Sequence, residues 1–339
     1  MPSKPPPPFW PALADSPLVS VIVPACNCAD FLEETLQSIV DQDYPRLEIL
    51  VIDDGSIDDT AAVAHGFQGP VQLLQTAQRS SGAGASRNVG LRAARGDLIA
   101  FLDGDDVWLP GKLQAQIECL RAYPECAMVA SEFTLWSPDE NGMWRAPGAF
   151  ARETGEEDPQ ALDPERSGWI YHRLLLDTIV WTGAVVMRRE LVDTIGEFRE
   201  DLRLAQDYDY WLRASRLTPI LTLARSFALY RRHPQSATKR WASTNYALSV
   251  LDSAVRQWGV SGPDGQKITP AELRRRRFGL HFSMGYQLFW NGARAAAAPS
   301  FWAAWRHRPT YWRTTPYALL TGALWLVSRL RPEASGKPR

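Results

Sequence analysis

The sequence has few cysteines and no long run of apolar residues, and each absence excludes a class of protein. Only four of the 339 residues are cysteine, namely Cys26, Cys28, Cys119 and Cys126. They form no CxxC pair, so neither a disulfide scaffold nor a zinc site is expected. No stretch reaches the ~18–20 apolar residues that a membrane-spanning helix needs. We therefore expect reduced thiols and a cytoplasmic protein.

The start of the chain also lacks a secretory signal. Residues 1–17, MPSKPPPPFWPALADSP, are proline-rich and contain no apolar core of the kind that a signal peptide needs. This composition is typical of a stiff, poorly ordered tail. We expect no folded structure before residue 18.

Two nucleotide-binding fingerprints are absent after the first apolar run. Residues 24–30 read PACNCAD. This segment lacks the GxGxxG pattern of NAD-dependent enzymes. It is also neither glycine-rich nor basic, which disfavours a sugar nucleotidyltransferase with its triphosphate-binding loop.

The formal net charge of −1 hides an uneven distribution of charge. Residues 241–339 contain 14 Lys and Arg against 4 Asp and Glu, so the rest of the chain carries the acidic excess. The same rear part is helix-prone and rich in tryptophan. We therefore predict a boundary at residue 240, with a basic, helical C-terminal region at residues 241–339.

Four apolar runs alternate with helical patterns in the front half of the chain. The runs predict strands at residues 18–23, 47–52, 71–74 and 98–102. Helices are predicted at residues 30–42, 82–95 and 110–122. Because the strands are continuously apolar, both faces of their sheet must be covered. Residues 18–240 are thus predicted to form an α/β domain with a Rossmann-like, mostly parallel sheet and helices on both faces.

This alternation stops at residues 137–168. The segment is polar and contains glycine and proline throughout, so it is predicted to be a long loop or insertion. Beyond it, the pattern predicts short helices at residues 188–194 and 206–215 and a strand at residues 220–229. No internal repeat is visible.

Aspartates follow two of the predicted strands. Asp53 and Asp54 close the second strand, and Asp103, Asp105 and Asp106 follow the fourth in the stretch FLDGDDVWLP. The carboxyl ends of parallel strands lie at one edge of the sheet, where ligands bind. We therefore expect both acidic turns to face one crevice.

Asp103 and Asp105 form a candidate site for Mg²⁺ or Mn²⁺. Carboxylates placed this close repel one another until a cation neutralises them, and these ions keep open positions for phosphate oxygens. Such an ion stabilises the charge that develops on a leaving diphosphate. The alternatives are a solvated acidic turn and, for Asp106, a cap of the following helix.

Three segments of the chain resemble the family-2 inverting glycosyltransferases, which have the GT-A fold. They read VSVIVPACNCADFLEETLQSIVDQDYPRLEILVIDDGSIDDT, then GAGASRNVGLRAARGDLIAFLDGDDVWLPGKL, then TGAVVMRREL, GEFRE and QDYDYWLRAS. Their order and spacing make the resemblance specific over about residues 19–238. It implies that residues 18–240 are a GT-A domain that moves a sugar from a nucleotide-diphosphate sugar to an acceptor hydroxyl with inversion. A UDP-sugar donor, a glycan or lipid-linked acceptor and a divalent metal are expected.

The resemblance also implies which residues bind the donor nucleotide and its diphosphate. They are Pro24, Asn27, Asp53, Asp54, Arg87, Asn88 and Asp103. The residues by themselves leave other roles open, because an Asp before Gly-Ser often forms an Asx-turn and a lone arginine can be a packing or surface residue.

The catalytic base and the third metal ligand come from the resemblance alone. Asp207, in QDYDYWLR, occupies the position of the family's base, and His233 resembles a histidine that completes the metal site together with Asp103 and Asp105. Gln206 departs from the family's usual glutamate. By the residues alone, Asp207 would be a helix cap and His233 a surface group. We expect Trp211, on the same helix as Asp207, to be a core residue and not a platform for the acceptor.

The basic rear segment leaves two interpretations open. Residues 273–280 (LRRRRFGL) and 305–313 (WRHRPTYWR) would suit an anionic membrane surface, contacted through about residues 273–331 on the inner face of the membrane. The apolar run at residues 316–330 would then lie in the interface. The other interpretation is a helical subdomain packed on the catalytic domain. Nucleic acid is not predicted as a partner.

Two other functions compete with glycosyl transfer. One is the sugar nucleotidyltransferase already disfavoured by the loop after the first strand. The other is a non-catalytic nucleotide-sugar-binding protein, which predicts the loss of an aspartate at position 103, 105 or 207. All three aspartates are present.

Overall fold

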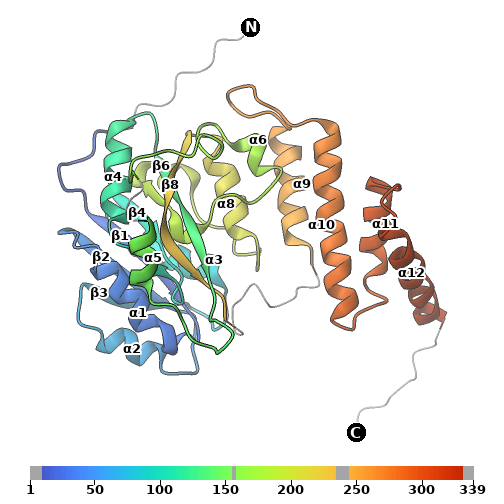
Figure 1. Cartoon of the computed structure of the whole chain (residues 1–339), viewed down its shortest axis with the longest axis horizontal. Helices are drawn as coiled ribbons and strands as arrows, with labels where there is room; N and C mark the ends of the chain where they lie inside the picture. The colour runs from blue at the N-terminus through green and yellow to red at the C-terminus, as the bar shows by residue number, and fades with distance from the viewer. Residues whose placement is uncertain (1–9, 155–157, 234–243, 331–339) are drawn as a thin grey trace. The chain divides into compact units, whose positions relative to one another are not determined.

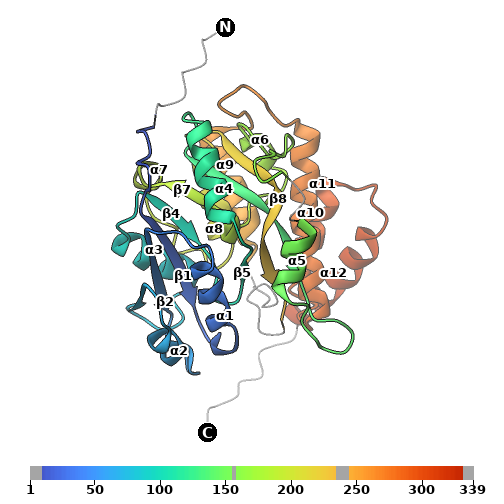
Figure 2. The ribbon, with the colours of Figure 1, turned by 60° about the vertical axis from the view of Figure 1, so that its left-hand side comes forward.

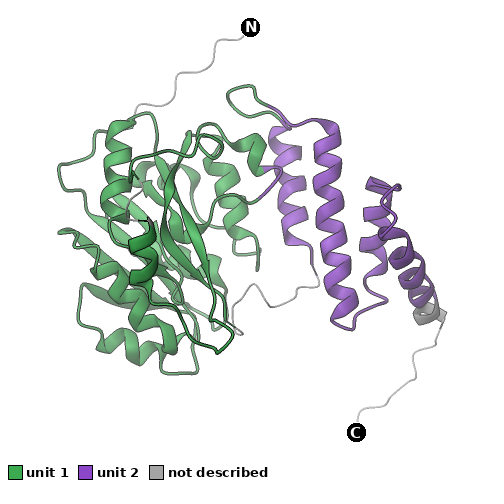
Figure 3. Cartoon of the chain, in the orientation of Figure 1, with its two compact units in different colours: residues 1–174, 178–234, 261–266 green, residues 175–177, 235–260, 267–339 purple. Residues whose placement is uncertain are grey.

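The computed structural model describes residues 10–154, 158–233 and 244–330. The chain divides into two compact units (Figure 3). Unit 1 comprises residues 1–174, 178–234 and 261–266, and unit 2 comprises residues 175–177, 235–260 and 267–339. The predicted boundary at residue 240 lies outside the described residues, as does most of the predicted N-terminal tail.

Unit 1 is built on an eight-stranded sheet with the order β3-β2-β1-β4-β7-β6-β8-β5 (Figure 1). Its N-terminal half consists of β3 (Val71–Gln75), β2 (Leu47–Asp53), β1 (Val19–Ala25) and β4 (Leu98–Phe101). These four strands are parallel, as predicted. Their succession from β2 through β1 to β4 can be followed in Figure 2.

The other half of the sheet is mixed, which the sequence pattern did not predict. It consists of β7 (Val186–Arg188), β6 (Met128–Trp136), β8 (Ile220–Arg231) and β5 (Val107–Trp108). The strand β7 is antiparallel to β4 and β6, and β5 is antiparallel to β8, whereas β6 and β8 run parallel. Two of these strands have only two or three residues, so they leave no periodic signal.

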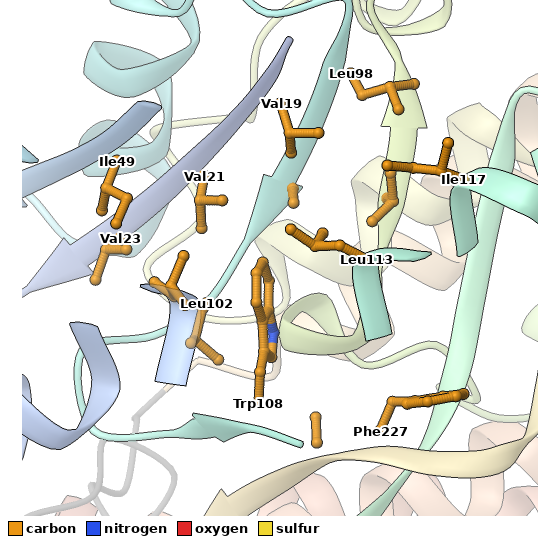
Figure 4. Close-up of a cluster of buried hydrophobic side chains, with 14 of the residues drawn as sticks. Val19, Val21, Val23, Ile49, Leu98, Leu102, Trp108, Leu113, Ile117 and Phe227 are labelled. Atoms are coloured by element: carbon orange, nitrogen blue, oxygen red, sulfur yellow. The ribbon is translucent and has the colours of Figure 1, made fainter. Parts of the chain in front are cut away.

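Helices cover both faces of the sheet, as predicted. Because side chains alternate along a strand, Val19, Val21 and Val23 of β1 all face one side, where they join a buried apolar cluster (Figure 4). Ile22 faces the opposite side. There a helix crosses so closely that a Cβ atom on Gly90 would lie 2.5 Å from Ile22 Cγ2.

The helices of unit 1 follow the predicted ones closely, with additions. They are α1 (Ala29–Val40), α2 (Thr60–Gly66), α3 (Ala83–Ala93), α4 (Lys112–Ala122), α5 (Pro147–Thr154), α6 (Tyr171–Leu174), α7 (Arg189–Ile195) and α8 (Gln206–Ala214), with a 3-10 turn, η1 (Thr182–Ala184). The prediction of a loop over residues 137–168 is wrong in part, because α5 lies within it. The Phe150 side chain of α5 packs against Trp136, and this contact stabilises the short helix.

One charged side chain is fully buried at the start of α4. The Lys112 ammonium donates a hydrogen bond to Gln116 Oε1 (2.7 Å) and lies 4.1 Å from the centre of the Trp108 ring. Burial without a carboxylate partner lowers the pKa of Lys112 well below its usual value.

Unit 2 is helical over its described residues, as expected for the C-terminal region. It contains α9 (Tyr246–Trp258), α10 (Pro270–Trp290), α11 (Ala298–His307) and α12 (Thr314–Leu330). Thr269 and Glu272 form a capping box at the start of α10, with Pro270 at the first helical position. An aromatic and aliphatic cluster that includes Phe301 joins α10, α11 and α12. Among the described helices, none is both long and apolar enough to cross a bilayer.

Candidate active site

Both acidic turns flank the carboxyl end of β1, because β2 and β4 are its two neighbours in the sheet. Pro24 lies near this end, and its carbonyl accepts a hydrogen bond from Gly104 N (3.1 Å), which joins β1 to the turn after β4. The topology therefore brings together the two acidic turns that the sequence placed after separate strands.

Asp53 and Asp54 hold the loops at this edge. Asp53 Oδ1 accepts a hydrogen bond from Ser56 N (3.0 Å), which is the Asx-turn that the sequence left open. Both oxygens of the buried Asp54 accept hydrogen bonds from the loop before α3, from Ser81 N (2.8 Å) and Gly82 N (2.8 Å). Asp54 thereby fixes the position at which α3 begins.

Asn27 braces the same edge from the β1 side. It adopts a left-handed backbone conformation (φ 53°), which asparagine tolerates better than most residues. Its Oδ1 accepts from Ile57 N (2.8 Å), and its backbone N–H donates to Ser56 Oγ (3.0 Å). The loop that follows β2 is thus tied to the loop that follows β1.

Arg87 of α3 points at the aspartate cluster from the helix side. Its side chain is 3% exposed, and Nη2 donates to Asp103 Oδ1 at 2.6 Å. The other two guanidinium nitrogens, Nε and Nη1, have no hydrogen-bond partner among the described residues. Buried donors are rarely left without a partner. The guanidinium carbon also lies 5.6 Å from the centre of the Phe198 ring.

Asn88 has a different task from its neighbour. Its Nδ2 donates to the carbonyl of Phe198 and to Glu200 Oε1, both at 2.9 Å, while its Oδ1 accepts from Phe198 N at 2.8 Å. The amide therefore fastens the segment before α8 onto α3. These contacts give Asn88 a structural role. That Asn88 also lies near the donor stays a prediction.

Asp105 pairs with His233. The distance from Asp105 Oδ2 to His233 Nε2 is 2.9 Å, and the histidine is only 5% exposed, so it is not a surface group. Burial raises the pKa of Asp105, and repulsion from Asp103 adds to this rise. Asp103 is thus paired with Arg87 and Asp105 with His233, so each carboxylate is held by a side chain from another part of the chain.

Asp106 does not cap the following helix, contrary to the alternative considered for it. The residue before α4 is Gly111, and Asp106 is fully buried, with its Oδ1 accepting from Arg231 N at 2.7 Å. Burial raises the pKa of the Asp106 carboxyl well above its usual range. Its position is explained by this hydrogen bond to Arg231, the last residue of β8.

Arg231 is a site residue that the sequence did not single out. Its Nε donates to the Asp105 carbonyl at 2.7 Å, and its Nη2 pairs with Glu34 of α1. The guanidinium carbon lies 4.1 Å from the centre of the Trp136 ring. Arg231 therefore fixes the backbone of the aspartate turn from a strand more than 120 residues further along the chain. No local pattern in the sequence could have indicated this role.

Asp207 lies in the first turn of α8, where the helix dipole favours a carboxylate. It is not the cap residue, which is Ala205. Its Oδ1 accepts from Tyr208 N (2.8 Å), and its Oδ2 lies 3.5 Å from the hydroxyl of Thr182, at the long end of hydrogen bonding. Trp211 of the same helix is fully buried, which confirms it as a core residue.

The start of α8 lies close to the start of α3, the helix that carries Arg87. A Cβ atom on Gly84 would lie 3.3 Å from the Gln206 side chain, so a glycine at position 84 permits this approach. Gln206 is buried, and a glutamate there, as in the family, would place a carboxylate in the contact. This packing brings the N-terminal turn of α8, which carries Asp207, close to the N-terminal turn of α3.

The donor set at this edge fits a divalent cation bound together with a diphosphate. Asp103, Asp105 and His233 offer the oxygen and nitrogen ligands that Mn²⁺ and Mg²⁺ accept. In the described part of the chain, no three acidic, histidine or cysteine side chains already converge on one ion position. Phosphate oxygens would have to complete the coordination.

The chain is similar to known glycosyltransferases. Residues 20–180 match the model of the family described as Glycosyl transferase family 2. TuaG of Bacillus subtilis, whose name provisionally assigns it to teichuronic acid biosynthesis as a glycosyltransferase, is 28% identical over 246 residues, which cover 72% of this chain and 87% of TuaG. An uncharacterized protein of Mycobacterium tuberculosis is 29% identical over 73% of this chain and 77% of its own length.

Solved structures show the same fold. Residues 1–349 of S. aureus TarS align over 92% of both chains with a TM-score of 0.58 and 19% identity. A mannosyltransferase from Pyrobaculum calidifontis, in complex with GDP-Man and Mn²⁺, aligns over 95% of this chain and 84% of its own with a TM-score of 0.56 and 21% identity. The predicted GT-A fold with a helical C-terminal extension is confirmed.

Proposed function

Since residues 20–180 match the model of glycosyl transferase family 2, we propose that the chain transfers a hexose from a nucleotide-diphosphate sugar to an acceptor hydroxyl, with inversion. A UDP-sugar is the favoured donor, because the TarS fold neighbour has been solved with UDP-GlcNAc. A glycan or a lipid-linked saccharide is the proposed acceptor. The observation that carries the proposal is the buried guanidinium of Arg87, which binds Asp103 and has two further nitrogens without a hydrogen-bond partner in the described part of the chain.

The donor would occupy the edge of the sheet between β2 and β4. Pro24, Asn27, Asp53 and Asp54 surround the nucleotide end of this edge, and Arg87 would bind the diphosphate through its two remaining nitrogens. Charge-assisted hydrogen bonds of this kind are the stronger ones in proteins. The loop contacts of Asp54 keep α3, and with it Arg87, in position.

Asp103, Asp105 and His233 would hold a divalent cation, with Mn²⁺ or Mg²⁺ as the proposed species. When bound, the cation supplies charge stabilisation for the leaving diphosphate. Arg231 has a positioning role, because it fixes the backbone of Asp105 and the side chain of Asp106.

Asp207 would act as the general base. An acceptor hydroxyl is a weak nucleophile, so Asp207 takes its proton while the oxygen bonds to the anomeric carbon. The bond from that carbon to the diphosphate breaks in the same step, which inverts the configuration. Thr182 donates toward Asp207 Oδ2 and helps to orient the carboxylate.

Calorimetric titration with UDP, GDP, ADP and dTDP, each with and without Mn²⁺, tests the donor site. We expect tight binding of one nucleotide, UDP, that depends on Mn²⁺ in the wild type and is lost in Asp105→Asn. Asp207→Asn should keep nucleotide binding and slow the release of UDP from the donor sugar by about 10²- to 10⁴-fold. The absence of nucleotide binding by the wild type under every condition would overturn the proposal.

We also propose that unit 2 contacts an anionic membrane surface. Several large apolar side chains of α11 and α12 are exposed, namely Trp302, Leu319, Leu320, Leu324, Trp325 and Leu326. A cavity of about 680 Å³ between these two helices is lined mainly by apolar side chains, with Arg306 among them. Apolar residues next to arginines are typical of helices that lie in the headgroup region. Such a contact would place the protein on the inner face of the membrane.

Vesicle binding tests this contact. The double variant Leu320→Ser and Leu326→Ser alters two side chains that are 50% and 56% exposed, so the fold should be retained. We expect it to co-sediment less than the wild type with phosphatidylglycerol vesicles. Leu135→Ser, which alters an equally exposed leucine (56%) of unit 1, is the matched control. Equal sedimentation of all three proteins would contradict the membrane contact.

A further inference from the structure

Three half-buried aromatic side chains form a cluster beside the proposed base. The ring centre of Trp181 lies 4.9 Å from that of Phe133 and 5.6 Å from that of Tyr230. Phe133 belongs to β6 and Tyr230 to β8, and Trp181 directly precedes η1. All three keep part of their surface exposed. We refer to Trp181, Phe133 and Tyr230 as the aromatic platform.

Each end of the platform is joined to the proposed reaction centre. Trp181 is followed by Thr182, whose hydroxyl lies 3.5 Å from Asp207 Oδ2. Tyr230 is followed by Arg231, whose Nε donates to the Asp105 carbonyl at 2.7 Å. Trp181 thus directly precedes the residue that contacts the proposed base, and Tyr230 directly precedes the residue that holds the Asp105 backbone.

The platform lies on a definite side of the strands β6 and β8. Side chains alternate along a strand, so Tyr230 and Arg231 point to opposite faces. The contacts agree, because Arg231 lies over the Trp136 ring while Tyr230 contacts Trp181. The Trp136 face packs against α5, whereas the platform face is the one that meets η1 and Thr182.

The position of the Trp181 ring is fixed by the backbone beside it. A Cβ atom on Gly183 would lie 2.6 Å from Cη2 of the Trp181 indole, so only glycine at position 183 leaves room for the ring. The carbonyl of Gly183 in turn accepts a hydrogen bond from Trp108 Nε1 at 2.8 Å. An aromatic ring that is held in this way needs no rearrangement before a ligand stacks on it.

We propose that the aromatic platform binds a pyranose ring of the acceptor, an inference that rests on the proposed function. A pyranose has an apolar face of C–H groups that stacks on an aromatic ring, and hydroxyls at its rim that would reach Asp207. In the proposed function, the donor nucleotide binds beside β2 and not at the platform. An extended polyol phosphate or a peptide has no such ring face, so the platform selects a saccharide acceptor.

An oligosaccharide array with UDP and Mn²⁺ present tests this assignment. The probes are oligosaccharides with terminal pyranose rings, with poly(glycerol phosphate) and short peptides beside them. We expect wild-type protein to bind pyranose-terminated probes and Trp181→Ala to bind them about 10-fold more weakly. Trp181→Phe should retain most of the binding, since it keeps an aromatic face. Trp144→Ala, which changes a half-buried aromatic on the Trp136 face, should bind as the wild type does.

Separate outcomes would overturn the platform and the glycosyltransferase proposal. Equal binding by Trp181→Ala and wild type, binding only to the polyol phosphate or the peptides, or no glycan binding at all would each overturn the platform. Calorimetry with UDP and Mn²⁺ on the same samples should give equal affinities for wild type and Trp181→Ala. If the wild type bound no nucleotide there, the proposed function itself would fail, whatever the array showed.

Discussion

Replacing Arg87 by methionine distinguishes a donor-binding role from a packing role. In the protein without donor, Arg87 pairs with Asp103, whose side chain is 33% exposed, and two of its buried nitrogens have no partner among the residues that the structure describes. An ion pair with such an exposed partner contributes at most about 1 kcal/mol, whereas each unsatisfied buried donor costs about 1–3 kcal/mol. We therefore expect the free energy of unfolding to fall by no more than about 1 kcal/mol.

The donor complex of Arg87→Met should be weakened far more. Two charge-assisted hydrogen bonds to the diphosphate, at about 1.5 kcal/mol each, sum to about 3 kcal/mol, or about 100-fold in Kd. Urea unfolding measures the first quantity, and calorimetry with UDP and Mn²⁺ measures the second. Arg92→Met is the matched control on the same helix, because the Arg92 pair with Glu197 is exposed. A Kd within about 2-fold of wild type, together with a loss of several kcal/mol of stability, would refute the reasoning.

Three further changes test the packing that positions the site. The first change is Lys112→Met. Burial lowers the pKa of Lys112 below the value of about 10.4 that it has in the unfolded chain, so the folded protein loses this proton at a lower pH. The free energy of unfolding of the wild type should therefore rise relative to that of the variant as pH increases toward 10.4, by about 1.4 kcal/mol for each unit by which the pKa is lowered. Urea unfolding between pH 7 and pH 10 measures this, and equal pH dependence of the two proteins would contradict it. Gly90→Ala would place a methyl group 2.5 Å from Ile22 Cγ2 and should lower the free energy of unfolding by about 1–3 kcal/mol. Thermal unfolding measures this loss. An unchanged melting temperature would show that α3 can shift away from β1 without cost. Arg231→Met removes the hydrogen bond from Nε to the Asp105 carbonyl but keeps the backbone N–H that Asp106 binds, so it should cost about 1–3 kcal/mol in urea unfolding, and an unchanged free energy of unfolding would remove its proposed positioning role.

The parts of the fold that the sequence predicted are those with a strong local period. The strands β1, β2 and β4 are largely apolar runs, whereas β3 has no buried residue, and α1, α3, α4 and α8 each begin or end within two residues of their predicted bounds. The strands β5, β6 and β7 were not predicted. For β5 and β7 the reason is that their two or three residues are ordered by neighbours far along the chain. The helix α5 was obscured by the polar, glycine- and proline-containing segment around it.

The candidate site divides in the same way. Asp103 and Asp105 follow a strand at a spacing that suggests a cation site, so they were found from the residues themselves. Asp207 came only from the resemblance to the family. Arg231 and Thr182 were missed, because each acts on a residue that is distant along the chain and neither belongs to a motif.

The contacts of Asp54 have a consequence for redesign of the enzyme. An attempt to change the preferred nucleotide base would naturally begin with the acidic pair after β2. Only one member of that pair is available for such a change, because both oxygens of Asp54 hold the loop that leads into α3 and hence to Arg87. A substitution at Asp54 would thus confound base preference with diphosphate affinity. Libraries for altered donor choice should vary Asp53 and leave Asp54 and Asn27 unchanged, because Asn27 ties together the loops after β1 and β2.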